Sequence, residues 1–513
     1  MSIPKIITMY LPQFHRVKEN DLWWGEGYTE WTAVKSAEPL YSGHVQPKEP
    51  LNDNYYDLLE KETMQWQADL MHKYGIFGQC FYHYYFKNGK KILEKPAENL
   101  LKWEKIDMPF CFSWANESWT RTWSKLSDDR NSWNDLIEPQ KQNDDEDGVL
   151  LLQDYGGRKE WEDHFYYLLP FFKDKRYIRI DDKPVFIIYM ANSIYCLNEM
   201  VECWQKLAIS EGLKGVYFIS TNRKNQNCDG ELISEPGFSI RRMLKSDYSG
   251  ASYGISMKAD YETVYKRCLS SGVTLGENVF RGIISGYDDT PRRGKGGMVL
   301  DGCTPEMFED YLRESLAASK NANSDYLFIN AWNEWGEGMY LEPDKKYGYA
   351  FLEAVKKAIE TIDDAKGDCE PVDNASNDQL EIYIKKLEQY DAYWRLFDKW
   401  MVLKENDLSL DVFFEENNYS SIAVYGLGML GRHLLADISI ERVAFGIDGK
   451  ADTIRMDFPI YSPVDAFPKA DIIVVTPTYD YDSIVRLLKQ NNDCKVVSLG
   501  YVIDHVYNSK LIK

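Results

Sequence analysis

The feature that most constrains the fold is a regular alternation of short apolar runs with helical patterns through the first two thirds of the chain. Each run is four to eight residues long, which is typical of strands buried on both faces. The predicted strands are 4–11, 76–81, 109–113, 184–189, 215–221, 231–234, 279–285 and 326–330, and the clearest helices are 56–74, 159–172, 196–211, 305–319 and 347–362. Eight such repeats predict an α/β fold, a parallel (β/α)8 TIM barrel, with an open doubly wound sheet as the alternative.

The length of the chain indicates more than one domain. At 513 residues it exceeds the roughly 250–300 residues at which single cores stop growing. We place the barrel at 1–362, a linker with an amphipathic helix at 363–417, and a second α/β unit at 418–513. Apolar residues within 379–403 recur at alternating spacings of four and three, which is typical of a coiled-coil seam. This helix either pairs with a second copy, giving a homo-oligomer, or lies on the barrel.

The second α/β unit opens with a glycine motif. Gly426, Gly428 and Gly431 follow the strand-like run 421–425, and Asp448 ends the next run, 443–447. This is the G-x-G-x-x-G pattern of dinucleotide-binding turns, with an acidic residue at about the expected distance of 20 residues. The pattern predicts a small Rossmann-like domain. Its role is either to bind a nucleotide as cofactor or to serve as a docking piece.

Two glutamates stand where the eighth predicted strand ends. Glu334 and Glu337 are three residues apart and are interleaved with Trp335 and Gly336. Breaking a glycosidic bond requires one carboxyl group that delivers a proton and a second that supplies or activates a nucleophile. Paired carboxyl groups can hold different protonation states near neutrality, and the tryptophans offer flat faces to sugar rings. The alternative is a helix N-terminus, where acidic residues are favoured.

Further polar and aromatic residues cluster after the other predicted strands. In a (β/α)8 barrel this end of the strands carries the active site. Their hydroxyl, imidazole, amide and guanidinium groups would bind sugar hydroxyls, and the tryptophans would stack on sugar rings; each could instead brace a loop. The candidate substrate-binding residues are Tyr10, His15, Trp23, Tyr82, His83, Trp114, Asn116, Glu117, Arg292, Asn330, Trp332, Asn333 and Trp335. His15 and His83 lack partners at metal-ligand spacing, so we expect no metal site.

Composition excludes some classes of partner and indicates a compartment. A formal net charge of −21 argues against nucleic acid, which requires a basic face. We expect no transmembrane segment, because no run of about 20 apolar residues occurs. The amino terminus lacks the pattern of a signal peptide. The nine cysteines are scattered and form no Cys-x-x-Cys pair, which favours free thiols and a cytoplasmic protein.

Several separate blocks resemble one family. They are Tyr10-Leu-Pro-Gln-Phe-His15, Trp23-Trp-Gly25, Tyr28-Thr-Glu-Trp31, Phe110-Cys-Phe-Ser-Trp-Ala-Asn-Glu-Ser-Trp119 and Asn330-Ala-Trp-Asn-Glu-Trp-Gly-Glu-Gly338. Over roughly residues 3–360 the chain resembles the glycoside hydrolase family 99-like proteins, and more closely their WbsX-type branch from bacterial O-antigen and capsule gene clusters. The resemblance implies a (β/α)8 barrel and a metal-free, endo-α-mannosidase-like site that requires no cofactor.

The resemblance also implies a retaining mechanism. Glu334 and Glu337 match the family motif Glu-Trp-x-Glu. Glu334 would be the base that helps the substrate's own 2-hydroxyl attack the anomeric carbon, giving an anhydro-sugar. Glu337 would be the general acid and then the base that activates water. Such a nucleophile implies a manno-configured or related glycan.

Three functions remain open from the sequence. The first is a glycoside hydrolase acting on such a glycan. The second is a WbsX-type glycosyltransferase of O-antigen or capsular polysaccharide biosynthesis, which would take a sugar donor; the extra C-terminal unit and the absence of an export signal favour assembly of polysaccharide in the cytoplasm. The third is a non-catalytic carbohydrate-binding barrel, which would have no need of both carboxylates.

Overall fold

The structure, a computed structural model, describes residues 2–120, 149–240, 257–270, 275–365, 393–394, 396–451, 453–478, 481–489 and 494–510. The chain forms two compact units, 1–372 and 373–513. Each is described by itself.

Eight parallel strands close into a barrel in the first unit. The ring runs through β1 (Lys5–Tyr10), β2 (Gly78–Tyr85), β4 (Phe110–Trp114), β8 (Lys183–Ile188), β9 (Tyr217–Thr221), β10 (Gly230–Ile233), β12 (Val279–Ile284) and β15 (Tyr326–Asn330). β1 pairs with β15, Lys5 lying opposite Tyr326, and also with β2, Ile7 lying opposite Gly78, which closes the ring. The predicted TIM barrel is therefore confirmed, and the open sheet is wrong.

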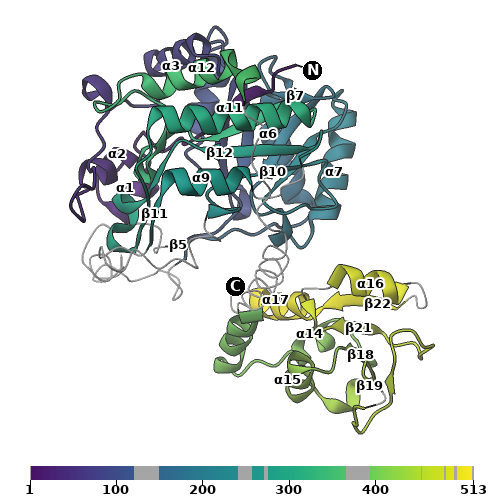
Figure 1. Ribbon diagram of the computed structural model, residues 1–513. Helices are drawn as coiled ribbons and strands as arrows, with labels where there is room; N and C mark the ends of the chain where they lie inside the picture. Colours follow the sequence, from purple (N-terminus) through teal and green to yellow (C-terminus); the bar gives the residue numbers. More distant parts are fainter. Residues whose placement is uncertain are drawn as a thin grey trace. The chain divides into compact units, whose positions relative to one another are not determined.

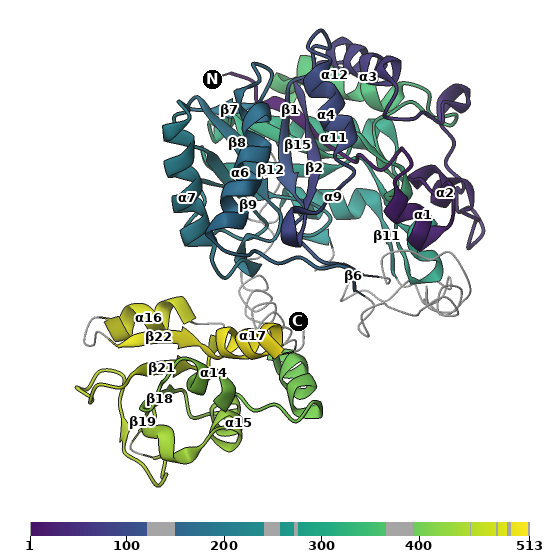
Figure 2. The same ribbon diagram turned by 180° about the vertical axis from the view of Figure 1, so that it is seen from behind.

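Helices surround the strands, as Figures 1 and 2 show from opposite sides. Each helix buries one face against the ring because its apolar residues recur with the helical period. The larger ones are α3 (Lys61–Lys73), α4 (Lys95–Lys102), α6 (Arg158–Lys173), α7 (Leu197–Ser210), α9 (Tyr261–Leu269), α11 (Pro305–Asn321) and α12 (Ala350–Glu360). All five helices expected from the sequence are among them.

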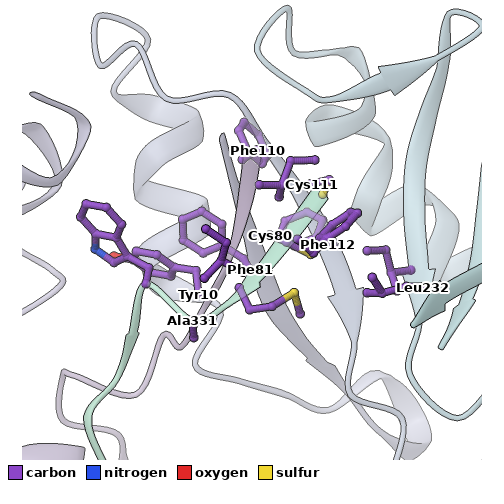
Figure 3. Packing of buried hydrophobic residues seen from close by; sticks show 14 of the residues in the cluster. Tyr10, Cys80, Phe81, Phe110, Cys111, Phe112, Leu232 and Ala331 are labelled. Atoms are coloured by element: carbon purple, nitrogen blue, oxygen red, sulfur yellow. The ribbon is translucent and has the colours of Figure 1, made fainter. Parts of the chain in front are cut away.

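A packed aromatic and aliphatic core lies on both faces of the strands, with Tyr10 and Phe81 on the face towards the helices. Figure 3 shows part of it, with Tyr10 beside Phe81 and with Cys80 near Cys111 on the neighbouring strand. The ring centroids of Tyr10 and Phe81 are 4.2 Å apart, and the Tyr10 hydroxyl donates to Gln67 Oε1 at 2.6 Å. In barrels of this kind a ligand binds at the carboxyl ends of the strands.

Short elements after the strands build the carboxyl-terminal face of the barrel. They include α1 (Lys18–Trp24), α2 (Glu30–Lys35), β13 (Tyr287–Asp288), α10 (Thr290–Arg293), β16 (Asn333–Glu334), η8 (Trp335–Glu337) and β17 (Met339–Tyr340). β16 and β17 form an antiparallel hairpin with Glu334 opposite Met339. Gly338 closes the intervening turn with a φ of 64°, a conformation that favours glycine.

The second unit is a five-stranded parallel sheet. Its order is β20 (Ile460–Tyr461), β19 (Val443–Ile447), β18 (Ile422–Tyr425), β21 (Ile472–Val475) and β22 (Lys495–Ser498). α15 (Met429–Asp437) and α17 (Leu499–Lys510) pack on one face, and α16 (Tyr481–Lys489) packs on the other. The sheet agrees with the strands predicted at 421–425, 443–447, 471–476 and 495–500.

The described part of the predicted coiled-coil-like helix belongs to this second unit. Residues 379–392 and 395 lie outside the described residues, and 396–405 are helical. Trp400 and Leu403 are buried in the core of the second unit, and Trp400 Nε1 donates to Asp437 Oδ2 at 2.8 Å. The heptad-like spacing at this end therefore reflects packing within the unit, which the sequence did not indicate. Oligomerisation through 379–403 stays a prediction.

Candidate active site

A cavity of about 340 Å³ lies at the carboxyl ends of the barrel strands. Six of its lining residues are aromatic and are called its aromatic wall below; the cluster of Glu30, Glu334, Glu337 and Arg292 is called its floor. The lining residues that matter below are the aromatic residues Trp24, Tyr28, Tyr82, Tyr84, Trp119 and Tyr189, together with Glu30, Glu117, Glu235, Arg292, Asn330, Glu334 and Glu337. Aromatic faces with a few convergent polar groups are typical of sites that bind small molecules.

One guanidinium group holds three carboxylates at this floor. Arg292 donates from Nη2 to Glu334 Oε2 at 2.7 Å and from Nη1 to Glu337 Oε1 at 2.7 Å. Its Nε donates to Glu30 Oε1 at 2.6 Å. Each nitrogen thus bonds a different carboxylate, and the four side chains carry two net negative charges when all are ionised. Charge-assisted bonds of this kind fix geometry tightly.

The two glutamates of the turn sit in different environments. The Glu334 side chain is 6% exposed and the Glu337 side chain is 22% exposed. Burial raises the pKa of Glu334 to about 8, the charges of Glu337 and Glu30 act in the same direction, and Arg292 opposes them. Burial works to lower the pKa of Arg292, but the three carboxylates hold that pKa well above its usual value. Burial and the two neighbouring carboxylates thus favour the protonated form of Glu334, and Arg292 favours the ionised form.

Another buried carboxylate, that of Glu342, supports the turn. Glu342 accepts hydrogen bonds from four side chains: Trp332, Trp335, Gln67 and Tyr56, at 2.7–2.9 Å. Asn333 is fixed as well, because its amide exchanges hydrogen bonds with the backbone of Leu11, at the end of the first barrel strand. Burial raises the pKa of Glu342 to about 7, against the effect of its donors.

The structure brings six of the fifteen predicted barrel-site residues to the cavity. They are Glu334, Glu337, Tyr82, Glu117, Arg292 and Asn330. Asn330 donates from Nδ2 to the Glu235 carbonyl at 2.9 Å. Its Oδ1 is buried and has no hydrogen-bond partner among the described residues.

The other nine predicted residues do not line the cavity. Trp332, Asn333, Trp335 and His15 are buried, Tyr10 is buried with its hydroxyl bonded to Gln67 of α3, and Trp23 packs against Trp119. Asn116 braces a loop, because its amide bonds both the N–H and the carbonyl of Met190. His83 and Trp114 lie beside α6.

Strand alternation explains the position of His83. Successive side chains of a strand point to opposite faces, and on β2 it is Tyr82 and Tyr84 that line the cavity. His83 therefore faces outward, with its Nε2 2.8 Å from Nε2 of His164 on α6. Burial lowers the pKa of His83 to about 3. Trp114 joins the same cluster, its ring packed edge-on against His164.

The sequence reasoning missed Glu30 and most of the aromatic wall. Glu30 stands in a loop crowded with Trp23, Trp24, Tyr28 and Trp31, and that crowding was the available signal. Nothing in the sequence linked this loop to Arg292. Within the described ranges no group of three or more His, Cys, Asp or Glu side chains could hold a metal ion. No described helix is long and apolar enough to cross a membrane.

The glycine motif of the second unit forms a tight strand-to-helix turn. Gly426 has a φ of 86°, and a Cβ at Gly431 would lie 2.1 Å from the Gly426 carbonyl oxygen. Gly428 precedes α15 and has open space around its Cα. Asp448 Oδ2 accepts the N–H of Leu427 at 2.8 Å, so this carboxylate braces the turn.

The barrel and its cavity define a (β/α)8-barrel protein with an acidic site at the carboxyl ends of its strands. Residues 6–355 match the family model described as Glycosyltransferase WbsX, and the chain belongs to this family. Membership places the chain among carbohydrate-active proteins.

The chain is also similar to particular proteins. It is 29% identical over 383 residues to the uncharacterized protein WxcX of Xanthomonas campestris pv. campestris (strain B100), covering 71% of this chain and 51% of that protein. The chain thus spans about half the length of this relative. Among solved structures, the GH99 endo-alpha-mannosidase from Bacteroides thetaiotaomicron is similar at 14% identity and a TM-score of 0.39, covering 71% of this chain and 98% of that one. The barrel assignment rests on the strand order and not on this similarity.

Proposed function

We propose that this chain is an enzyme acting at the anomeric carbon of a manno-configured or related glycan, with retention of configuration. The observation that carries the proposal is the placement of Glu334 and Glu337 on one guanidinium at the floor of an aromatic-walled cavity. Membership of a family named for glycosyltransferases supports a carbohydrate substrate.

In the proposed reaction Glu334 takes the proton of the substrate's 2-hydroxyl as that oxygen attacks C1. Glu337 gives its proton to the departing oxygen, so the C1–O bond breaks as the new C1–O2 bond forms. Glu337 then takes a proton from the incoming hydroxyl as it attacks C1. The C1–O2 bond opens, and O2 recovers its proton from Glu334. A buried carboxylate with a raised pKa suits the base, because a stronger base removes a hydroxyl proton more readily.

The more exposed Glu337 suits the group that exchanges protons with the leaving and entering oxygens. Arg292 keeps both carboxylates oriented, and the negative charge of the floor stabilises the positive charge that develops at C1. The aromatic wall packs against the C–H faces of the ring.

The direct test is turnover of α-linked manno-oligosaccharides by purified protein, with product configuration followed by NMR. We expect Glu334→Gln and Glu337→Gln each to lower kcat by a factor of about 100 or more. Glu353→Gln, a change at an exposed position of α12, is the matched control. Turnover that survives in both site variants contradicts the assignment. Binding without turnover in the wild type, unchanged in both variants, would instead indicate a carbohydrate-binding barrel.

The second candidate is a glycosyltransferase, which the family description favours. The same two glutamates serve transfer when a sugar hydroxyl replaces water as the attacking group. Nucleotide- and lipid-linked sugars, each offered with and without an oligosaccharide acceptor, separate the two activities. A product longer than the acceptor indicates transfer, whereas free sugar alone indicates hydrolysis. A role in O-antigen or capsule assembly in the cytoplasm belongs to this second candidate.

Nucleotide binding by the second unit is a separate proposal. It rests on the turn formed by Gly426, Gly428 and Gly431 and on the open space at Gly428. Because Asp448 already accepts the Leu427 N–H, only its other lone pairs are available to a ribose hydroxyl. Calorimetric titration with nucleotides and nucleotide-sugars tests this proposal, and Gly428→Val, which fills the open space, should abolish any binding.

A further inference from the structure

Glu30 is the third carboxylate on the guanidinium that holds Glu334 and Glu337. It belongs to α2, far from both glutamates in sequence, and it is 1% exposed. Its Oε1 accepts the Nε–H of Arg292 at 2.6 Å. With Nε held there, the two terminal nitrogens of the planar guanidinium are left for the two glutamates of the turn.

The backbone at Glu30 is fixed by its own hydrogen bond and by the contacts of the next residue. Its backbone N–H donates to the Gln13 carbonyl at 3.0 Å. Trp31, the next residue, donates from Nε1 to the Tyr56 carbonyl at 2.9 Å and packs against Trp335, with ring centroids 5.5 Å apart. The carboxylate is therefore presented by a rigid backbone, in contact with the same turn that carries the glutamates.

Gly336 leaves the room that this carboxylate occupies. A Cβ at Gly336 would lie 1.8 Å from Glu30 Oε1 and 2.9 Å from Arg292 Nε. The φ of Gly336 is not in the left-handed region, so the backbone there could accept alanine. Glycine is thus required between Trp335 and Glu337 because a larger side chain would have no space there. The Glu30–Arg292 pair occupies that space.

We propose that Glu30, seated in the space left by Gly336, is a positioning residue that orients Arg292 and places a third negative charge beside Glu334 and Glu337. Removing Glu30 would leave Arg292 with two carboxylates, so Glu334 would be bound more strongly and would ionise at lower pH. The proposal rests on the proposed function for its catalytic meaning, but its physical content concerns the carboxylates alone.

The first test is a double-mutant cycle on stability, which requires no substrate. Gly336→Ala should lower the midpoint of thermal unfolding clearly in the wild-type background. In a Glu30→Ala background the same change should lower the midpoint of thermal unfolding far less, because the added methyl group enters the space that the Glu30 side chain has left. Gly276→Ala is the control, since a methyl group there meets nothing within 4 Å. An equal loss from Gly336→Ala in both backgrounds would overturn the seating of Glu30 in this space.

The second test measures the ionisation of Glu334 by NMR of 13C-labelled glutamate carboxyl groups, assigned by comparison with Glu334→Gln. Glu30→Gln keeps the shape and removes the charge, and we expect the Glu334 carboxyl to titrate about one pH unit lower. Glu353→Gln should leave that titration unchanged. An unchanged titration in Glu30→Gln would overturn the charge role. Lack of turnover by the wild type would refute the proposed function while leaving both of these results intact.

Discussion

Trp335 donates a hydrogen bond of 2.7 Å from Nε1 to Oε2 of Glu342, so a buried carboxylate holds the turn between the two site glutamates. The opposite oxygen, Oε1, accepts Trp332 Nε1 at 2.9 Å. The residues on either side of Asn333 and Glu334 are thereby tied to one point. Neither tryptophan lines the cavity, and both are bonded to this anchor instead.

Replacing Glu342 should loosen that anchor. Glu342→Gln places an N–H donor among four donors, and each buried donor left without an acceptor costs about 1–3 kcal/mol. We therefore expect a marked fall in the free energy of unfolding by denaturant titration, with a fall in kcat. Glu353→Gln serves as the control for loss of a charge. Wild-type stability in Glu342→Gln would show that the four hydrogen bonds are not needed.

The dependence of rate on pH should distinguish the roles of the two glutamates. If Glu334 is the base, it must be ionised, and its pKa is raised to about 8 by burial. The rate should then rise with pH towards about 8, and it should fall again where Glu337 has lost the proton that it delivers. Initial rates between pH 5 and 10 give the profile. A profile with no rising limb towards pH 8 would contradict Glu334 as the base.

The His83–His164 pair should make the barrel sensitive to acid. Burial lowers the pKa of both rings, that of His83 from 6.5 to about 3. The unfolded chain therefore binds more protons than the folded one between these values, and stability is lost as pH falls from 6.5 towards 3. Denaturant titrations at several pH values measure this loss of stability. The double variant His83→Phe, His164→Phe should lose less stability at low pH than the wild type, whereas His72→Asn, a change at an exposed position, should lose as much as the wild type. An equal loss in the double variant would refute the pair as the cause.

The glycines of the second unit should respond differently to a methyl group. Gly431→Ala places a Cβ 2.1 Å from the Gly426 carbonyl oxygen, whereas Gly428→Ala meets nothing within 4 Å. Overpacking of this kind costs about 1–3 kcal/mol, so Gly431→Ala should lower the unfolding transition of this unit in calorimetry. Gly428→Ala should leave it nearly unchanged. Similar transitions in the two variants would contradict the close helix–strand contact.

The barrel could be predicted from the sequence because each strand is a short apolar run ending in a polar cluster, as in Tyr326–Asn330 followed by Glu334. Even the short run at 231–234 corresponds to β10. It was harder to predict which side chains of a strand face the cavity. Tyr82 and His83 are adjacent and both polar, and only the packing of the strand on α6 decides which of them faces the cavity. The pairing of Arg292 with Glu30 joins residues 262 apart and depends on loop conformations that no local pattern encodes.

The seam between β1 and β15 also governs how the chain reaches its native state. Lys5 lies opposite Tyr326, so the ring cannot be sealed until nearly the whole barrel has left the ribosome. Until then β1 presents an unpaired backbone edge, which is a hazard for association with other nascent chains. Contacts so distant in sequence form slowly. Truncation before residue 326 would therefore leave an open sheet, whatever number of complete strand–helix repeats precedes the cut.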